Sequence, residues 1–358
     1  MIYNKLMRKG VFAAAAAAML LLAACGERQN EQEPASPTGS ADPGSARPTE
    51  IPPEPSEAPP GGGTDDVGED ESDEDRAERE VVLDSATEQL MYRGIYYEIT
   101  GDDTASAVDY YDLELAEIDF PDELAYGGKS YRVTAIGDEA FSYCYELTKV
   151  SFGKNVEQIG DAAFQGCYEL RELSFSGGLS SIGDNTFESC EALTDVMLPD
   201  GLRSIGSEAF CSCYALVNIR LPEGLESVGD NVFFDCTDMK RIELPSSLKS
   251  VSYGMFTNCY ALSEVVLSEG VTVIEQEAFW SCESLKDIKL PESLVYIGDQ
   301  AFYSAGLVQI TMPENQVSLG EDIFNYCDDL ETVYVKEASA EYYEAALEGH
   351  PFVVEKLK

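Results

Sequence analysis

The stretch Ile205-Gly206-Ser207-Glu208-Ala209-Phe210, continued by Cys213, Leu216, Ile219 and Leu221-Pro222, decides the fold of this chain. Its first position returns every 23 residues, and once more one residue early. The residues at this position are Ile136, Ile159, Ile182, Ile205, Val228, Val251, Ile274, Ile297 and Leu319. A fixed period in the twenties is typical of a solenoid, in which no unit can bury its apolar face alone. The sequence therefore predicts a solenoid of about nine units over residues 136–335.

Within each unit, the segment Leu-x-x-Val-x-Leu predicts a strand, as in Leu193, Val196 and Leu198. These strands should stack into a parallel sheet on a concave face. The following Ile-Gly-Asp-x-Ala-Phe segment predicts a tight turn and then a short helical or irregular arc on the opposite side. One phenylalanine of each unit should join an internal spine: Phe141, Phe164, Phe187, Phe210, Phe233, Phe256, Phe279, Phe302 and Phe324. Burial of each ring contributes roughly 1.5–3 kcal/mol.

The consensus Ile-Gly-x-x-Ala-Phe-x-x-Cys-x-x-Leu-x-x-Ile-x-Leu-Pro resembles the BspA-like, or Treponema pallidum-type, leucine-rich repeat. Residues 126–133 resemble the strand that often precedes the first repeat of that family, and Lys336 to Leu357 resemble its closing segment. The departures are local, because Ala305 replaces the cysteine of its unit, and Ser252 and Glu275 replace the glycine. The resemblance implies a leucine-rich-repeat surface protein that binds ligands without chemical conversion.

The N-terminal residues 1–25 predict a lipoprotein signal peptide. A basic start with Lys5, Arg8 and Lys9 precedes a short apolar run. The run ends in Leu22-Ala23-Ala24-Cys25, which resembles a bacterial lipobox, although an ordinary signal peptide is the alternative. Two or three acyl chains hold a protein stably on a membrane. We therefore expect export and lipid anchoring at Cys25, with the protein exposed on the bacterial cell envelope.

The segments on either side of the repeats have separate predictions. Residues 26–80 are rich in proline and then acidic, a composition that favours a disordered tether. Residues 81–135 contain aromatic and β-branched runs between turns, which predict a β-rich N-terminal cap. Residues 336–358 should form the C-terminal cap. Terminal units of solenoids are atypical because they cover the open ends.

Eight cysteines occupy one repeat position: Cys144, Cys167, Cys190, Cys213, Cys236, Cys259, Cys282 and Cys327. Disulfides are the first interpretation in an exported chain. Regular placement, one per coil, favours instead a ladder of buried thiols, because free cysteine is among the most buried residues. The pair Cys211 and Cys213 is a weak indication of redox chemistry.

Composition narrows the classes of function. The formal net charge is -44, which argues against nucleic acid as a partner, since phosphate backbones need clustered lysine and arginine. The chain contains one histidine, His350, so histidine-based metal sites or catalytic triads are not expected. We expect no enzyme activity, no cofactor, no catalytic residues, no metal site and a monomeric state.

Ligand binding is expected on the outward side chains of the strands. The candidate residues are Met197, Asn218, Arg220, Arg241, Glu243, Val266, Lys289 and Tyr334. Two arginines lie at the middle of this face, although simple cross-strand pairing, for example of Arg220 with Glu243, is the alternative interpretation. A second candidate is an edge of tyrosines that follow the repeat cysteines, at Tyr145, Tyr168, Tyr214 and Tyr260. Exposed tyrosine suits protein or sugar ligands, but these rings can also simply cover the flank of the solenoid.

The resemblance implies a function in adhesion: binding of a protein or glycan ligand on host matrix, host cells or other bacteria. The alternative is binding or scaffolding of the cell's own envelope, such as wall glycan or a surface protein. A third hypothesis is an accessory subunit of an envelope enzyme. Fold alone does not choose among them, because solenoid scaffolds host many partners.

Overall fold

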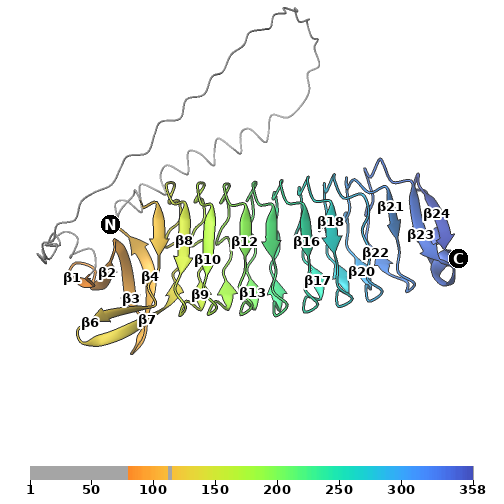
Figure 1. The fold of residues 1–358 in the computed structure, drawn as a ribbon. Coiled ribbons are helices and arrows are strands. Elements are labelled where there is room, and N and C mark those ends of the chain that lie inside the picture. Colours follow the sequence, from red (N-terminus) through yellow and green to blue (C-terminus); the bar gives the residue numbers. More distant parts are fainter. Residues whose placement is uncertain (1–79, 112–114, 358) are drawn as a thin grey trace, which may run out of the picture. The chain divides into compact units, whose positions relative to one another are not determined.

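The computed structural model describes residues 80–111 and 115–357. The predicted signal peptide, the lipobox residue Cys25 and residues 26–79 of the predicted tether lie outside this part of the chain. Within it, no helix has the length and apolar character needed to cross a membrane. The described chain is mostly strand and turn (Figure 1).

The repeats form a β-solenoid of parallel strands, as the sequence predicts. Most Leu-x-x-Val-x-Leu segments give long strands that lie side by side in Figure 1. These strands are β8 (Lys149–Phe152), β10 (Glu172–Phe175), β12 (Asp195–Met197), β14 (Asn218–Arg220), β16 (Arg241–Glu243), β18 (Glu264–Val266), β21 (Gln309–Thr311) and β23 (Thr332–Lys336). The segment of the seventh unit, which ends at Leu290, instead forms only an isolated bridge between Lys289 and Thr311. In β12 and β14 the central residue is buried and the two flanking residues are exposed, so alternate side chains face the core and the solvent.

A second column of short parallel strands runs along the solenoid, and the sequence analysis did not predict it. These strands hold the first position of each repeat. They are β9 (Gln158–Ile159), β11 (Ser181–Ile182), β13 (Ser204–Ile205), β15 (Ser227–Val228), β17 (Ser250–Val251), β19 (Val273–Ile274), β20 (Tyr296–Ile297) and β22 (Ser318–Leu319). The long strands pair in separate groups, β5-β8-β10, β12-β14, β16-β18 and β21-β23-β24, so the short-strand column links coils at several places where the long strands do not pair.

The short-strand column is interrupted between β15 and β17. The coils approach closely at Gly229 on this repeat position, because a Cβ atom there would lie 2.3 Å from the backbone nitrogen of Ser207. Ser252 is the first residue with a side chain at this position, and its hydroxyl donates to the carbonyl of Gly229 at 2.7 Å. Glu275 also carries a side chain at this position, but β17 and β19 remain paired there, so a Cβ atom alone does not explain the break.

The segments that return from a short strand to the next long strand are called arcs here. They comprise residues 137–147, 160–170, 183–193, 206–216, 229–239, 252–262, 275–285, 298–307 and 320–330. The sequence predicts that these segments are either helical or irregular. The arcs are successive turns, so they are irregular and not helical. Two residues of each arc have positive φ, for example Glu208 at 56° and Ser212 at 57°, and a right-handed helix cannot contain them.

The phenylalanine spine forms as predicted. The rings from Phe141 to Phe324 are at most 3% exposed, and rings of adjacent coils stack with centroids 5.2 to 5.9 Å apart. The repeat cysteines are buried beside this spine. From Cys167 onward each thiol donates to the phenylalanine carbonyl of the preceding coil, at 2.9 to 3.4 Å. The ladder therefore consists of inward-facing groups of the core.

The described residues before the repeats form seven strands. They are β1 (Val82–Asp84), β2 (Gln89–Tyr92), β3 (Ile95–Ile99), β4 (Thr104–Tyr110), β5 (Glu117–Asp119), β6 (Glu123–Tyr126) and β7 (Lys129–Ile136). β1 to β4 pair as an antiparallel sheet, and β4 continues in parallel to β7. β5 pairs with β8, and β7 pairs with β9, both in parallel. This segment therefore supplies the first rung of both strand columns.

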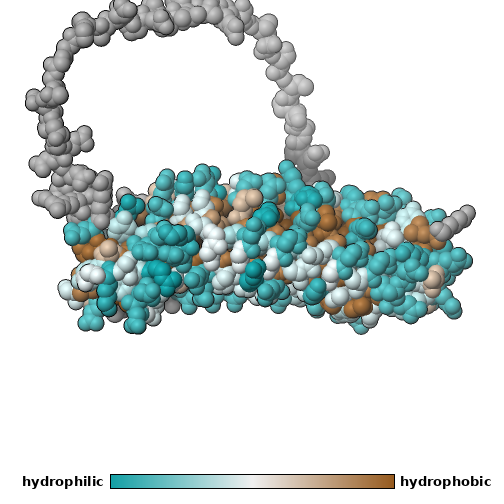
Figure 2. All heavy atoms as spheres, turned by 60° about the horizontal axis from the view of Figure 1, so that its bottom comes forward, coloured by the Kyte–Doolittle hydropathy of each residue, from teal (hydrophilic) through white to brown (hydrophobic). Residues whose placement is uncertain are grey.

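Residues after the repeats form a 3₁₀ turn (Glu337–Ser339), the helix α3 (Ala340–Ala346) and the strand β24 (Val353–Leu357). β24 pairs in parallel with β23 along five residues. The hydroxyl of Tyr343, on α3, donates to the carbonyl of Asn315 at 2.7 Å and accepts from the backbone nitrogen of Val317. These bonds fix the closing segment to the last coils. Figure 2 shows hydrophobic residues in small groups between hydrophilic ones on one side of the molecule.

Candidate functional site

The strand face consists of the outward side chains of the long strands and contains the main candidate residues. Two rows of side chains run along it, and equivalent residues are paired between β8 and β10, β12 and β14, β16 and β18, and β21 and β23. Asp195 pairs with Asn218, and Met197 pairs with Arg220. Arg241 pairs with Glu264 on the next strand. Parallel strands lie about 4.8 Å apart, so each row is a ladder with that spacing.

The two central arginines both have carboxylate partners in the structure. Arg220 Nη2 lies 3.0 Å from Asp200 Oδ1, a residue in the turn after β12, rather than beside Glu243. Arg241 Nε lies 2.8 Å from Glu264 Oε1, and its Nη2 lies 3.2 Å from Glu243 Oε2. Hydrogen bonds from Arg241 to Glu264 and then Glu243 raise the pKa of the guanidinium. An acidic ligand group would have to compete with these carboxylates.

The remaining strand-face candidates differ in how much surface they offer. Met197 is 65% exposed beside Arg220. Asn218 donates its amide to Asp195 Oδ1 at 2.8 Å. Lys289 is exposed opposite Thr311, whereas Val266 and Tyr334 are half-buried. The structure brings Met197, Asn218 and Arg220 together on β12 and β14, and places Tyr334 several coils away on β23.

The tyrosine edge contains both stacked and exposed rings. The rings of Tyr145 and Tyr168 stack across adjacent coils with centroids 5.6 Å apart. Tyr214 and Tyr260 are more than a third exposed. Sequence reasoning missed a further stack, in which the single tryptophan Trp280 lies 4.0 Å from the ring of Tyr303. Aromatic residues 23 positions apart are the signal that could have identified this pair.

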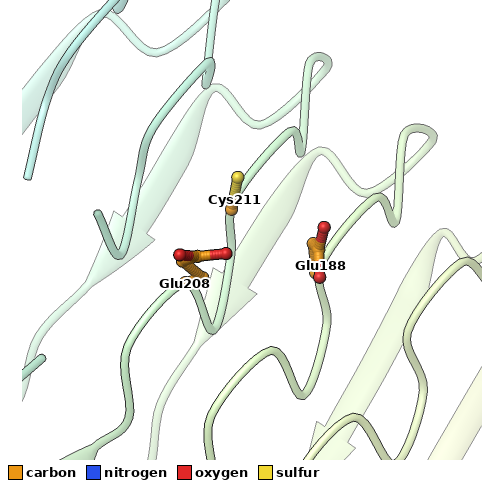
Figure 3. A group of neighbouring side chains, drawn as sticks. All are labelled: Glu188, Glu208 and Cys211. Carbon is orange, nitrogen blue, oxygen red and sulfur yellow. The ribbon is translucent and has the colours of Figure 1, made fainter. Parts of the chain in front are cut away.

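The structure also brings together Glu188, Glu208 and Cys211, whose ligand atoms all lie within 4.8 Å of one another. Figure 3 shows Glu188 on one coil and the other two residues on the next. The amide of Asn185 donates to both carboxylates, at 2.9 and 3.1 Å. Burial, above all, raises the pKa of Cys211 to about 12, so its sulfur remains a thiol at neutral pH. A protonated thiol is a poor metal ligand, and we assign no metal to this group.

The neighbouring Cys213 is part of the core ladder. Its sulfur donates to the carbonyl of Phe187 at 3.3 Å, whereas the sulfur of Cys211 lies 3.6 Å from the Ser212 hydroxyl. Burial raises the pKa of Cys213 well above its usual value. The pair of cysteines therefore lacks the low pKa that activates redox thiols.

A shallow groove of about 710 Å³ follows the short strands from β7 to β15. Small residues such as Ser181 and Ser204 line it, together with Asp138, Asp161 and Asp184. The Oδ1 atoms of these aspartates accept backbone N–H bonds from the next coil, at 2.7 to 2.9 Å. Their carboxylates thus help to hold the coils together.

These features define the class of protein, a leucine-rich-repeat solenoid with an exposed and varied strand face. A model of the "BspA type Leucine rich repeat region (6 copies)" matches residues 134–263 and, in an overlapping match, 203–331. Together the two matches cover more than half of the chain. The chain belongs to the BspA-type leucine-rich-repeat proteins. The similar proteins below are also leucine-rich-repeat proteins, a family that is not typically enzymatic.

Solved structures of leucine-rich-repeat proteins are similar to this chain. A leucine-rich repeat protein from Bacteroides ovatus is 26% identical, with a TM-score of 0.62, over 75% of this chain and 76% of that chain. The T. pallidum leucine-rich repeat protein is 22% identical over 75% and 98% of the two chains, with a TM-score of 0.48. A leucine rich cell surface protein from Faecalibacterium prausnitzii is 21% identical over 78% and 95%, with a TM-score of 0.46. No curated protein matches the chain.

Proposed function

We propose that this protein is a lipid-anchored protein of the bacterial cell surface that binds a protein or glycan ligand without catalysis. The observation that carries the proposal is the strand face, where outward residues vary from coil to coil while the core residues repeat. Membership of the BspA-type family supports ligand binding in general. The signal-peptide pattern that ends at Cys25 supports export and anchoring.

The proposed contact region is the middle of the strand face, around β12 to β18. Met197 offers apolar surface beside Arg220, and arginine is enriched among residues that dominate binding energies. Because the arginines already face carboxylates, we expect apolar and hydrogen-bonding contacts to contribute more than net charge. The proposed role is adhesion to host matrix, host cells or other bacteria.

The test is binding of the full-length chain, purified in detergent, to immobilised matrix proteins and to cell-wall material. The Arg220→Ala/Arg241→Ala variant should lose most of the saturable binding to a matrix protein. The matched control is Arg171→Ala/Arg203→Ala, which removes the same charge from exposed positions outside the candidate site. Absence of saturable matrix binding by the parent chain, or equal losses in the two variants, would contradict the adhesion proposal.

The second candidate function is binding of the cell's own envelope, and the same experiment separates it from adhesion. Saturable binding to wall material alone would favour this function. A role as accessory subunit of an envelope enzyme predicts co-purification with an active enzyme, which a screen of the native membrane complex can detect. Half-buried Tyr334 and exposed Lys289 extend the strand face toward β24 for either partner.

A further inference from the structure

The arcs and the rest of each repeat differ in charge. The nine arcs contain twenty aspartate and glutamate residues and no lysine or arginine. The segments between them, up to residue 335, contain ten basic and thirteen acidic residues. The solenoid therefore concentrates its negative charge in the arcs, while the strand segments are nearly neutral. An even surface coating that serves solubility alone would not need this division.

Most arc carboxylates have no cation beside them. Among residues 80–111 and 115–357, the arc carboxylates that form an ion pair are Glu169, with Arg171, and Asp329, with Lys286. Both cations follow directly after an arc. Glu188 and Glu208 lie close together with amide donors between them instead of a charge. The arcs therefore present uncompensated negative charge.

Aromatic rings lie among these carboxylates. The exposed ones are Tyr145, Tyr214, Tyr260 and Tyr326. Burial and then the nearby carboxylates of Asp235 and Glu283 raise the pKa of Tyr260, consistent with a negative potential around its ring. The faces of such rings attract ammonium and guanidinium groups. Carboxylates and rings on the same or neighbouring arcs thus offer two kinds of attraction to a cation.

The arcs hold these groups in a fixed arrangement. Backbone hydrogen bonds join each arc to the next, as from Phe187 to the carbonyl of Ala209 and from Phe279 to that of Ala301, both at 2.8 Å. Coils follow one another about every 4.8 Å, so nine arcs cover about 38 Å. An extended peptide rises about 3.3 Å per residue, and about twelve residues would follow the whole length. A ligand chain would meet a surface that is already ordered.

We propose that the arc face, formed by the nine arcs together, binds a lysine- and arginine-rich polypeptide segment. Nucleic acid and anionic lipid headgroups are repelled by this charge, and a neutral glycan gains nothing from it. Lysine and arginine carry their charge on long apolar stems, which suits a surface that carries both carboxylates and rings. The surface is separate from the strand face of the proposed function and does not depend on it.

Oligolysine of ten residues is the probe, and its affinity for the full-length chain is measured by fluorescence anisotropy at low and high salt. Residues 65–80 also contain many carboxylates, which could bind oligolysine themselves. All variants are therefore made in a parent chain in which the Asp and Glu residues of this segment are replaced by Asn and Gln. The arc variant replaces exposed carboxylates that form no ion pair among the described residues: Glu146→Gln, Glu191→Gln, Asp238→Asn and Glu283→Gln. The control variant makes the same change of charge in strand segments: Glu157→Gln, Glu172→Gln, Glu226→Gln and Glu331→Gln.

The arc variant should weaken binding of oligolysine by about tenfold or more at low salt, and the control variant by less than about threefold. Binding by the parent should fall steeply as salt rises, because exposed charges are screened. A Tyr214→Leu/Tyr260→Leu variant should weaken it about threefold or more without a change of charge. No binding by the parent at low salt, or equal losses in the arc and control variants, would overturn the proposal. Neither outcome bears on matrix binding through Arg220 and Arg241, so the two proposals fail separately.

Discussion

Replacement of Phe256 by alanine tests whether the phenylalanine spine stabilises the solenoid. The ring is fully buried and stacks between Phe233 and Phe279, with centroids 5.7 and 5.4 Å away. Removal of a buried phenylalanine side chain typically costs about 3–5 kcal/mol, because apolar burial is lost and a cavity remains. Both neighbours of Phe256 are rings that lose a partner, so we expect a loss of about 4 kcal/mol in the free energy of unfolding.

The assay is urea unfolding followed by circular dichroism and by the fluorescence of Trp280. This tryptophan is the only one in the chain and lies one coil beyond Phe256, so it reports on the coils next to the substitution. In a thermal melt followed by the same signals, the Tm should fall by about 10 °C, from the usual 2–4 °C per kcal/mol in domains of this size. Met197→Ala is the control, since this exposed side chain should change stability by less than about 0.5 kcal/mol. A loss below about 1 kcal/mol for Phe256→Ala would refute the assignment of stability to the spine.

Two further predictions follow from the pKa shifts. At pH 8 the thiols of Cys211 and Cys213 should react with iodoacetamide at least about 100-fold more slowly in the folded chain than in guanidinium, because burial raises their pKa values. Peptide mass spectrometry measures the labelling rate of each cysteine. Rapid labelling of Cys213 in the folded chain would contradict its place in the core. The carboxyl of Glu292 has a lowered pKa, since Lys336 donates to it at 2.6 Å. Its stabilising effect is present above about pH 4.5 and is lost as pH falls through the lower folded pKa. Glu292→Gln should therefore lower the Tm at pH 7 and have no effect at pH 2; equal differences at both pH values would exclude this ion pair as the cause.

The core could be predicted from the sequence because each buried residue recurs at a fixed interval. The burial of Phe210 and Cys213 can be predicted without knowledge of tertiary contacts, because each packs against the equivalent residues of the adjacent coils. The short strands such as β13 escaped prediction because two residues are too few to show an alternating pattern. Their pairing becomes visible when coils are stacked, and the recurring glycine at the position of Gly206 is its signal in the sequence.

The conformation of the arcs and the ion-pair partner of Arg220 were not predicted from the sequence. Asn185, Ser212 and their equivalents at positive φ are mostly small or polar residues, and this preference could have excluded helical arcs. The partner of Arg220 could not be derived from cross-strand register, because Asp200 lies in a turn and reaches the strand face from the side. Side-chain direction in turns depends on local backbone geometry that a repeat pattern does not specify.

The constant coil gives the chain a simple way to change length. Excision of residues 206–228 would join Ile205 to Gly229, and every interior contact across the new seam would have a close equivalent in the present molecule. A duplication of the same 23 residues would add one rung, about 4.8 Å, to the stack. Unequal recombination within the gene can therefore alter how many ligand-facing rungs are displayed while leaving both end segments and the packing between coils unchanged.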